Sequence, residues 1–222
     1  MKPPILIAHQ GDTVNFHENT LEAFQSAFEK GANGVELDIH YHNNELIVVH
    51  NYLFDKHKRY LKLSEVLALF SKKGRIEIEV KSMELGFLIP LKKLLKTYKH
   101  ADIEITTSIF PLVNYIYSEL SDYPLGIIFH EKDFENWMTD NFKREKIIKI
   151  MKLCKAQRVH IPNKEATESL VKECHLNKYM VHSHIYLQPR EKQVDLYHDF
   201  MKLEVDQCTF DDIALLEYLK ER

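Results

Sequence analysis

The sequence has few of the features that mark several common classes of protein. Its 222 residues include three cysteines, Cys154, Cys174 and Cys208, and no Cys-x-x-Cys pair, so neither a zinc ribbon nor a disulfide framework is indicated. No apolar run approaches the roughly 20 residues that a membrane-spanning helix needs. The sequence therefore predicts reduced thiols and a cytoplasmic protein without stable membrane insertion.

Net charge and linker-like segments are also scarce. The formal net charge is −3, and no basic excess or like-charge tail indicates binding to nucleic acid. The apolar run at residues 5–8 follows a single lysine and is too short for the apolar region of a signal peptide. Because no stretch rich in proline, serine or glycine divides the chain, we expect one domain over residues 1–222.

The chain does show a regular alternation of short β-rich runs with helix-length amphipathic segments. The strand candidates are residues 5–9, 34–42, 75–81, 102–109, 125–131, 158–162, 179–187 and 205–210. The helix candidates begin near residues 20, 63, 85, 112, 141, 165, 190 and 212, with apolar side chains at the i, i+3, i+4 spacing. An extra strand-like run at residues 45–51 follows a turn at Asn43-Asn44 and belongs to the second βα connection.

This alternation predicts an α/β fold, a single-domain (β/α)₈ TIM barrel. The alternative is a doubly wound open sheet, which is expected to carry a glycine-rich phosphate turn after its first strand. Here the corresponding turn, residues 9–20, contains only one glycine, Gly11. The barrel is therefore the favoured interpretation.

Polar side chains that suit metal and phosphate chemistry collect on the first three barrel strands. They are His9 in the first strand, Glu36 and Asp38 in the second, and Glu77, Glu79 and Lys81 in the third. Each pattern alone also fits a solvated strand face, but functional residues of a TIM barrel lie at the carboxyl ends of its strands, where these patterns coincide. Buried carboxylates need a partner or a metal, so Glu36, Asp38 and Glu79 suit Mg²⁺ or Ca²⁺, with Mn²⁺ also compatible.

Several histidines accompany this group. His9 and His50 would flank it as acid and base, and Lys81 would neutralise a bound anion. The remaining histidines near predicted strands are His40, His42, His130, His160, His182 and His184. A second metal such as zinc is one interpretation of them, and polar residues lining a wet pocket is the favoured one.

The motifs over residues 5–81 resemble those of the glycerophosphodiester phosphodiesterase family. In order, they are "HQG" at 9–11, "ENT" at 18–20, "GVELD" at 34–38, "VVHN" at 48–51 and "EVK" at 79–81. The resemblance implies a (β/α)₈ barrel, a divalent metal, and hydrolysis of a small-molecule glycerophosphodiester to an alcohol and glycerol 3-phosphate.

The resemblance also implies roles for individual residues. The implied metal ligands are Glu36, Asp38 and Glu79, the acid/base pair is His9 and His50, and the substrate-binding or phosphate-binding residues are Gln10, Glu18 and Lys81. Gln10 departs from the family, which has an arginine at this position. Glutamine keeps a hydrogen-bond donor but loses the charge, at an expected cost of about 2–4 kcal/mol in the transition state.

Because of Gln10, the sequence keeps other functions open. One is a catalytically weakened relative that binds a phosphorylated ligand or a partner, and another is a lysophospholipase D-like enzyme. A phosphate-binding isomerase or aldolase barrel ranks last, because no glycine-rich turn follows the last strands. The alcohol, the metal, the nucleophile (water or the substrate's own hydroxyl) and the oligomeric state are not defined by the sequence.

Overall fold

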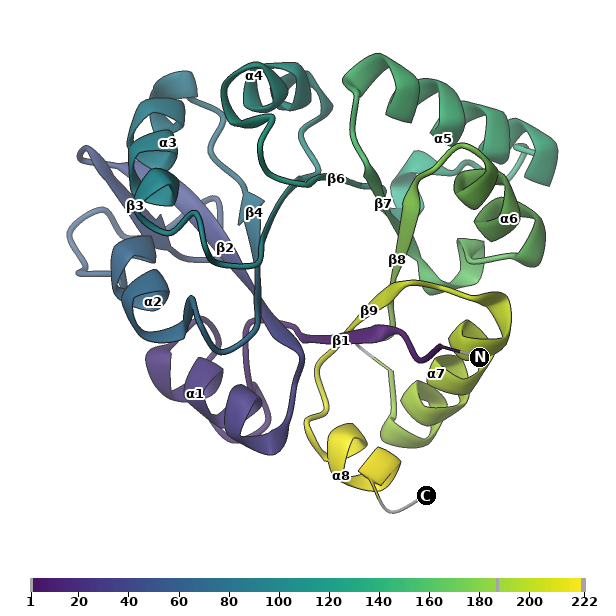
Figure 1. The fold of residues 1–222 in the computed structure, drawn as a ribbon, viewed down its shortest axis with the longest axis horizontal. Helices are drawn as coiled ribbons and strands as arrows, with labels where there is room; N and C mark the ends of the chain where they lie inside the picture. The colour runs from purple at the N-terminus through teal and green to yellow at the C-terminus, as the bar shows by residue number, and fades with distance from the viewer. Residues whose placement is uncertain (1, 187, 221–222) are drawn as a thin grey trace.

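The computed structural model describes residues 2–186 and 188–220. Over these residues, eight parallel strands close into a barrel, because β1 pairs with β2 on one side and with β9 on the other (Figure 1). The barrel strands are β1 (Ile5–Ala8), β2 (Gly34–His42), β4 (Arg75–Val80), β5 (Ile103–Thr107), β6 (Leu125–Ile128), β7 (Arg158–Pro162), β8 (Met180–His184) and β9 (Gln207–Phe210). The predicted TIM barrel is confirmed.

Helices surround the barrel and follow its strands in sequence (Figure 1). They are α1 (Leu21–Lys30), α2 (Leu63–Phe70), α3 (Leu88–Thr97), α4 (Phe110–Leu120), α5 (Asp140–Cys154), α6 (Glu168–Leu176), α7 (Arg190–Leu203) and α8 (Ala214–Lys220), with short 3₁₀ turns η1 (Leu85–Phe87), η2 (Glu131–Asp133) and η3 (Asn163–Glu165). The helix expected near residue 165 begins at Glu168 instead, because the Thr167 hydroxyl caps it by accepting a hydrogen bond from the Leu170 N–H.

Helix α1 shows how local sequence fixes the frame of the barrel mouth. Ala23, Phe24 and Ala27 are buried on one face of the helix. The Thr20 hydroxyl accepts a hydrogen bond from the Ala23 N–H, and Gly31 ends the helix in the left-handed region at φ 101°. The residues just before Thr20 are therefore held at the end of β1, where the barrel opens.

The extra run at residues 45–51 contains a strand outside the barrel, β3 (Glu45–Val48), which pairs antiparallel with β2. Asn43 and Asn44 link the two strands with left-handed backbone angles of φ 49° and 62°, as a two-residue hairpin turn requires. The hairpin turns the chain back toward the barrel, and the Val49 N–H donates to the Asp38 carbonyl over 3.1 Å. This return places His50 beside β2.

Strand β4 illustrates how the barrel separates apolar from polar side chains. Ile76, Ile78 and Val80 belong to the apolar core between the strands and the helices. Glu77 and Glu79 alternate with them and are also buried, so they face the barrel interior. The interior of a TIM barrel is commonly filled by branched apolar residues, and here it is strongly polar.

Several predicted strands extend too far at their carboxyl ends. The runs at 5–9, 125–131 and 179–187 end at Ala8, Ile128 and His184. Their alternating pattern continues past each strand end, where His9, Phe129 and Ile185 still donate backbone hydrogen bonds to neighbouring strands before the chain turns into a loop. Leu187, within the last of these runs, lies outside the described residues.

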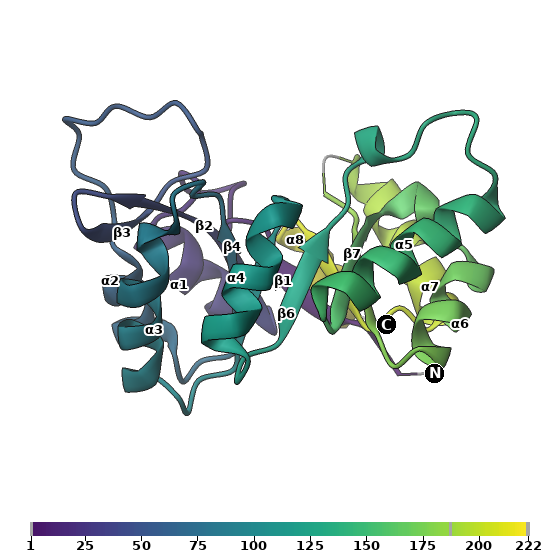
Figure 2. The ribbon, with the colours of Figure 1, turned by 90° about the horizontal axis from the view of Figure 1, so that it is seen from above.

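Two long loops rise from the same end of the barrel, residues 49–62 and residues 129–139 (Figure 2). They follow the β2–β3 hairpin and β6, and so belong to the end at which the strands finish. None of the described helices is both long and apolar enough to cross a bilayer.

Candidate active site

Three buried carboxylates meet at the mouth of the barrel, and we call them the mouth cluster: Glu36, Asp38 and Glu79. Strands β2 and β4 are neighbours, and their register sets Asp38 directly beside Glu79. One carboxylate oxygen from each residue lies within 4.8 Å of the other two. The structure thus brings together the three side chains that the sequence marks as metal ligands.

The mouth cluster is poorly compensated by protein groups. Burial, together with the charge of Asp38, raises the pKa of Glu36 well above its ordinary value, and burial raises the pKa of Glu79 to about 7. Asp38 Oδ1 is buried, and its contact is the ion pair with Lys81. Three hard carboxylates that repel one another and share one lysine fit a divalent cation.

Lys81 provides the nearest positive charge. Its Nζ lies 3.2 Å from Asp38 Oδ1 and 3.5 Å from Glu79 Oε2. Burial opposes its charge, but these carboxylates outweigh burial and hold the pKa of Lys81 above its usual range. Lys81 is therefore a fixed cation next to the mouth cluster.

Gln10 is a buried clamp between two other residues of the site. Its Nε2 lies 2.7 Å from Asp38 Oδ2 and 2.8 Å from His50 Nδ1. Burial opposes ionisation of Asp38, but the hydrogen bond from His50 and the charge of Lys81 hold the pKa of Asp38 low, so this side chain is a carboxylate. A carboxylate repels a carbonyl oxygen, so the amide nitrogen of Gln10 must face it.

His50 is held through one ring nitrogen. Its Nδ1 also lies 3.1 Å from Asp38 Oδ2, and this hydrogen bond is the main cause that raises the pKa of His50. Asn19, in a left-handed conformation at φ 57°, donates from Nδ2 to the same Asp38 oxygen over 3.0 Å. With Nδ1 engaged, Nε2 is the nitrogen that His50 presents to a bound molecule.

His9 is the second histidine at the mouth cluster, and it lies immediately after β1. Its ring stacks on Tyr186 with 4.4 Å between centroids and 8° between planes. It lines a small cavity together with Glu36 and Glu79. Burial lowers the pKa of His9 to about 4, so its imidazole is neutral at neutral pH.

Glu18 lies farther out than the other predicted site residues. It lines a pocket of about 330 Å³ with His50, Lys58 and Tyr60, between the start of α1 and the 49–62 loop. This pocket borders the mouth cluster through His50. The structure therefore gathers His9, Gln10, His50, Lys81 and the mouth cluster, and sets Glu18 at the rim.

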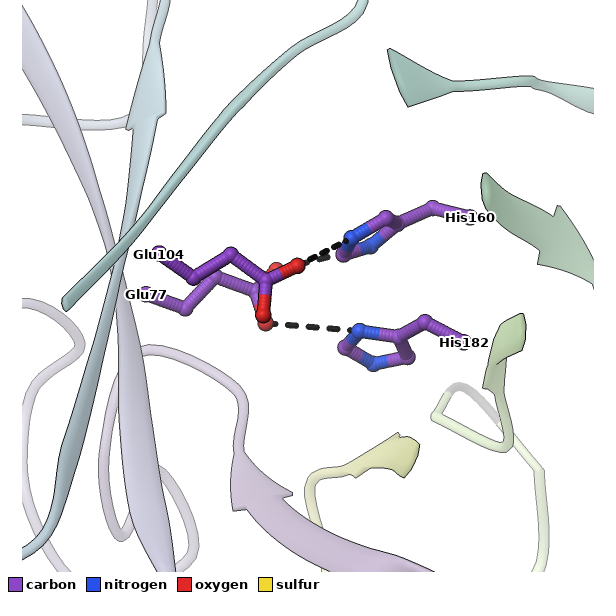
Figure 3. A group of neighbouring side chains, drawn as sticks. All are labelled: Glu77, Glu104, His160 and His182. Carbon is purple, nitrogen blue, oxygen red and sulfur yellow. Dashed lines mark hydrogen bonds and ion pairs between the residues drawn. The ribbon is translucent and has the colours of Figure 1, made fainter. Parts of the chain in front are cut away.

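A second polar group fills the barrel below the mouth, and we call it the interior cluster: Glu77, Glu104, His160 and His182 (Figure 3). His160 Nε2 lies 2.9 Å from Glu104 Oε1, and His160 Nδ1 lies 3.5 Å from Glu77 Oε1. His182 Nδ1 lies 3.3 Å from Glu77 Oε2. Gly126 makes room for this group, because a Cβ there would come within 2.7 Å of His160 Nε2.

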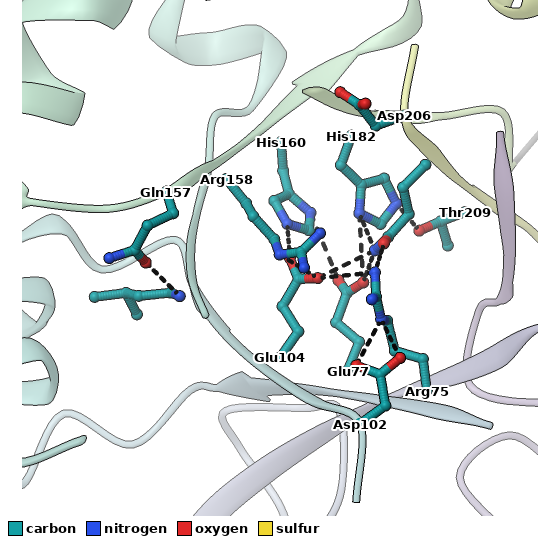
Figure 4. A network of polar contacts seen from close by, with 12 residues as sticks. Arg75, Glu77, Asp102, Glu104, Gln157, Arg158, His160, His182, Asp206 and Thr209 are labelled. Atoms are coloured by element: carbon teal, nitrogen blue, oxygen red, sulfur yellow. Dashed lines mark hydrogen bonds and ion pairs between the residues drawn. The ribbon is translucent and has the colours of Figure 1, made fainter. Parts of the chain in front are cut away.

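Arginine and amide groups surround the interior cluster (Figure 4). Arg158 Nε lies 3.0 Å from Glu104 Oε2, and Arg75 Nη1 lies 3.7 Å from the same oxygen. Gln207 Nε2 lies 2.9 Å from Glu77 Oε2 and 2.9 Å from His182 Nδ1. The ligand atoms of the cluster are close enough to share an ion, but protein cations and an amide already occupy them.

No motif in the sequence groups the four residues of the interior cluster, and the sequence places two of its histidines in the wrong surroundings. His160 and His182 were interpreted as lining a wet pocket, yet both are fully buried, whereas His130 and His184 do line a pocket. The sequence carries one signal for the interior cluster: a polar residue interrupts an apolar strand, as Glu104 does. The same signal marks Glu36 and Asp38, which the structure brings together with Glu79.

Comparison with known proteins bears first on the N-terminal motifs. The sequence model of the Glycerophosphoryl diester phosphodiesterase family matches residues 9–57. A curated glycerophosphodiester phosphodiesterase of Caldanaerobacter subterraneus subsp. tengcongensis is 43% identical over 53 residues. That alignment covers 23% of this chain and 22% of the relative.

Solved structures extend the likeness to the whole barrel. A glycerophosphodiester phosphodiesterase from Thermotoga maritima has a TM-score of 0.71 at 22% identity, with 100% of each chain covered. An Oleispira antarctica phosphodiesterase, in complex with the product sn-glycerol-3-phosphate, has a TM-score of 0.81 at 13% identity, covering 99% of this chain and 98% of that one. These likenesses show the fold. The likeness in sequence to the glycerophosphoryl diester phosphodiesterase family is to the N-terminal motif segment, and the likeness in fold extends over the whole barrel.

Proposed function

We propose that the protein is a metal-dependent phosphodiesterase that hydrolyses small glycerophosphodiesters to an alcohol and glycerol 3-phosphate. One observation carries the proposal: three carboxylates with mutually close oxygens lie at the barrel mouth beside a lysine and between two histidines. The near-neutral charge of the chain supports a small-molecule substrate rather than nucleic acid. We assign the reaction to the cytoplasm, as the sequence predicts.

Glu36, Asp38 and Glu79 would hold the cation, Mg²⁺ or Ca²⁺ being the best match to three carboxylates. When bound, the cation would stabilise the negative charge that develops on the phosphoryl oxygens. Lys81 contributes a second, permanent charge to the same oxygens. The interior cluster is not assigned to this metal, because arginine side chains already compensate its carboxylates.

The two histidines suit opposite halves of acid/base catalysis. His9 is neutral and accepts the proton of the attacking hydroxyl, whether this belongs to water or to the substrate's glycerol arm. His50 has a raised pKa and a free Nε2, so it donates a proton to the leaving oxygen. Gln10 and Asp38 fix the ring of His50 for this transfer. Glu18, at the rim, accepts hydrogen bonds from substrate hydroxyls.

The product bound in the Oleispira antarctica structure, sn-glycerol-3-phosphate, supports this substrate class. A direct test incubates the purified protein with glycerophosphocholine, glycerophosphoethanolamine, glycerophosphoglycerol and lysophospholipids. Each is assayed with Mg²⁺, Ca²⁺, Mn²⁺ or EDTA, and glycerol 3-phosphate and lysophosphatidic acid are measured. We expect glycerol 3-phosphate with at least one cation, none in EDTA, and recovery when the cation is restored.

Variants separate catalysis from contamination. His50→Ala should reduce the rate at least about a hundredfold, whereas His100→Ala, at an exposed histidine before β5, should leave it unchanged. Absence of product with every cation would overturn the proposal. Lysophosphatidic acid as the main product would instead identify the lysophospholipase D-like variant, which exposed Leu53 and Trp137 on the two mouth loops favour.

A second candidate is a binding protein derived from this enzyme family. Gln10 favours it, because the amide nitrogen is engaged by Asp38 and His50 and brings no charge to a phosphate. Titration calorimetry with glycerol 3-phosphate and Mg²⁺ or Ca²⁺ distinguishes the two. Binding without turnover of any diester would support this candidate, and turnover that His50→Ala abolishes would exclude it.

A further inference from the structure

A second pocket opens beside the mouth cluster, on the side of the barrel formed by β6, β7 and β8. It has a volume of about 220 Å³, below the roughly 300–1,000 Å³ of pockets that take whole drug-sized ligands. Its lining includes Phe129, His130, Glu131, Asn163, His184 and Tyr186. His130, His184 and Tyr186 also line the small cavity that contains His9, Glu36 and Glu79. The pocket is therefore continuous with the candidate catalytic centre.

His184 is the unusual member of this pocket. Both of its ring nitrogens are buried and have no hydrogen-bond partner among the described residues. Its ring stacks on His182 at 5.1 Å and meets the edge of Tyr186 at 5.2 Å, so its position is set by neighbouring rings. An unsatisfied buried polar group costs about 1–3 kcal/mol, and such a group in a native protein calls for an explanation. A ligand that fills the pocket would supply the missing partners.

The pocket offers neutral groups that both donate and accept. Burial, together with the neighbouring His160, lowers the pKa of His184 well below its ordinary value, and burial lowers that of His130. A neutral imidazole has one donor and one acceptor nitrogen, and the Asn163 amide and Tyr186 hydroxyl have both functions as well. Alcohol groups have this same dual character. The lining thus matches vicinal hydroxyls better than it matches an ion.

Among the described residues of the lining, the only carboxylate is already compensated. Glu131 Oε2 lies 2.8 Å from Lys164 Nζ, so it does not present a free negative charge to a quaternary ammonium group. The small volume of the pocket also disfavours an acyl chain. A choline headgroup and a lipid tail are therefore both poor matches to this pocket.

We propose that this pocket binds an uncharged polyol arm of the phosphodiester, such as a glycerol or inositol headgroup, with His184 as a specificity-determining residue. The inference rests on the proposed function, since the phosphate of the same molecule would lie at the mouth cluster. It adds the class of alcohol, which the sequence left undefined.

The test compares kcat/KM for glycerophosphoglycerol, glycerophosphoinositol and glycerophosphocholine in the unmodified protein and in His184→Phe. Phenylalanine keeps a ring of similar shape and removes both nitrogens. We expect the unmodified protein to prefer the polyol diesters, and His184→Phe to raise KM for them about tenfold, as the loss of one to two hydrogen bonds predicts. Its KM for glycerophosphocholine should not change. The same exchange at exposed His100 is the matched control.

Thermal unfolding distinguishes a binding role of His184 from a structural one, because the loss of a structural side chain would lower the unfolding midpoint. Because the nitrogens of His184 have no partner in the free protein, His184→Phe should leave the unfolding midpoint unchanged or raise it. Equal preference for choline and polyol diesters, or an equal KM change for both, would overturn the proposal. If no diester is hydrolysed, the phosphodiesterase proposal fails and calorimetric binding tests the pocket by itself. Glycerophosphoinositol that binds more tightly than glycerophosphocholine, and less tightly to His184→Phe, would support the pocket. Equal binding of the two diesters would overturn it.

Discussion

The mouth cluster and the interior cluster both contain buried carboxylates and share strand β4, yet they are compensated differently. Strand β4 contributes Glu79 to the first and Glu77 to the second, two residues apart on one face. In the interior cluster, Arg158 and Arg75 lie beside Glu104. In the mouth cluster, three carboxylates share one lysine, Lys81.

This difference separates a structural network from a binding site. Burial of a carboxylate is tolerated where cations and hydrogen-bond donors surround it, and such a group resists replacement. Three buried carboxylates that share one cation, Lys81, instead repel one another at a cost that a bound metal ion can offset. We therefore expect changes to the mouth cluster to affect activity, and changes to the interior cluster to affect stability.

The largest expected effect is that of Asp38→Asn. The change removes a proposed metal ligand and the carboxylate that accepts from His50 and Gln10, so kcat/KM should fall about a thousandfold. Stability should fall by much less, because the amide gives up the ion pair with Lys81 but relieves the repulsion from Glu36. Kinetics with saturating cation and a thermal melt measure the two effects. Activity within tenfold of the unmodified protein, with Asp199→Asn at an exposed pair with Lys202 as control, would contradict the assignment.

Glu104→Gln should have the next largest effect, and it should fall on stability. The change leaves Arg158 as a buried cation without its partner and weakens the contact with His160, at an expected cost of about 3 kcal/mol in unfolding free energy. Urea denaturation measures this cost. Glu119→Gln, in an exposed pair with Lys92, is the matched control and should cost less than about 1 kcal/mol. Equal costs for the two variants would show that the interior network is not stabilising.

The effect of Glu104 should also depend on pH. Burial opposes its ionisation, but the hydrogen bond from His160 and the charges of Arg158 and Arg75 hold the pKa of Glu104 below its ordinary value of 4.5. Folding therefore favours the carboxylate, and its contribution is complete above about pH 4.5 and lost as the pH falls through the lower folded pKa. The difference in unfolding free energy between the unmodified protein and Glu104→Gln should shrink in acid. A difference that grows in acid would reverse the assigned charge state.

The mouth cluster was predictable because its ligands carry their signal in sequence. Each one interrupts an apolar strand near its carboxyl end, and β2 and β4 are adjacent in the barrel as well as in the alternation of elements. The eight βα units were predictable for a similar reason, because their hydrophobic periods are local. No local pattern predicts that the hairpin returns His50 to Asp38; only the family resemblance indicated that His50 belongs to the site.

The interior cluster was not predictable in the same way. Glu104, His160 and Gln207 come from strands far apart in the chain, and they meet only because the barrel closes and its register brings their rows to one level. Tertiary packing likewise determines which arginine side chains replace water around the carboxylates of the interior cluster. For Gln10, sequence indicated a missing charge, but the clamp on Asp38 and His50 depends on a left-handed turn.

Substitutions of Gln10 should be able to lower or to raise the activity of the mouth cluster. Gln10→Met removes the hydrogen bond to Asp38 and the contact of the amide with the His50 ring, and it should lower kcat about tenfold by loosening that ring. Gln10→Arg supplies several donors, so one can remain on Asp38 while another reaches the phosphate, and kcat/KM should rise about tenfold. Steady-state kinetics on one diester measure both variants. A loss in Gln10→Arg as large as that in Gln10→Met would show that the amide itself is required.

The smallest expected effect is that of Glu77→Gln. This variant is the natural comparison for Glu104→Gln, because the two glutamates are paired in the register of β4 and β5. Burial and the charge of Glu104 raise the pKa of Glu77 well above its ordinary value, which favours the neutral carboxyl in the folded protein. An amide then replaces a neutral acid of the same shape. It still accepts from Gln207 and still offers a donor toward His160, so urea denaturation should show a change below about 1 kcal/mol. A cost equal to that of Glu104→Gln would mean that Glu77 is ionised and that the interior cluster carries an uncompensated charge, as the mouth cluster does.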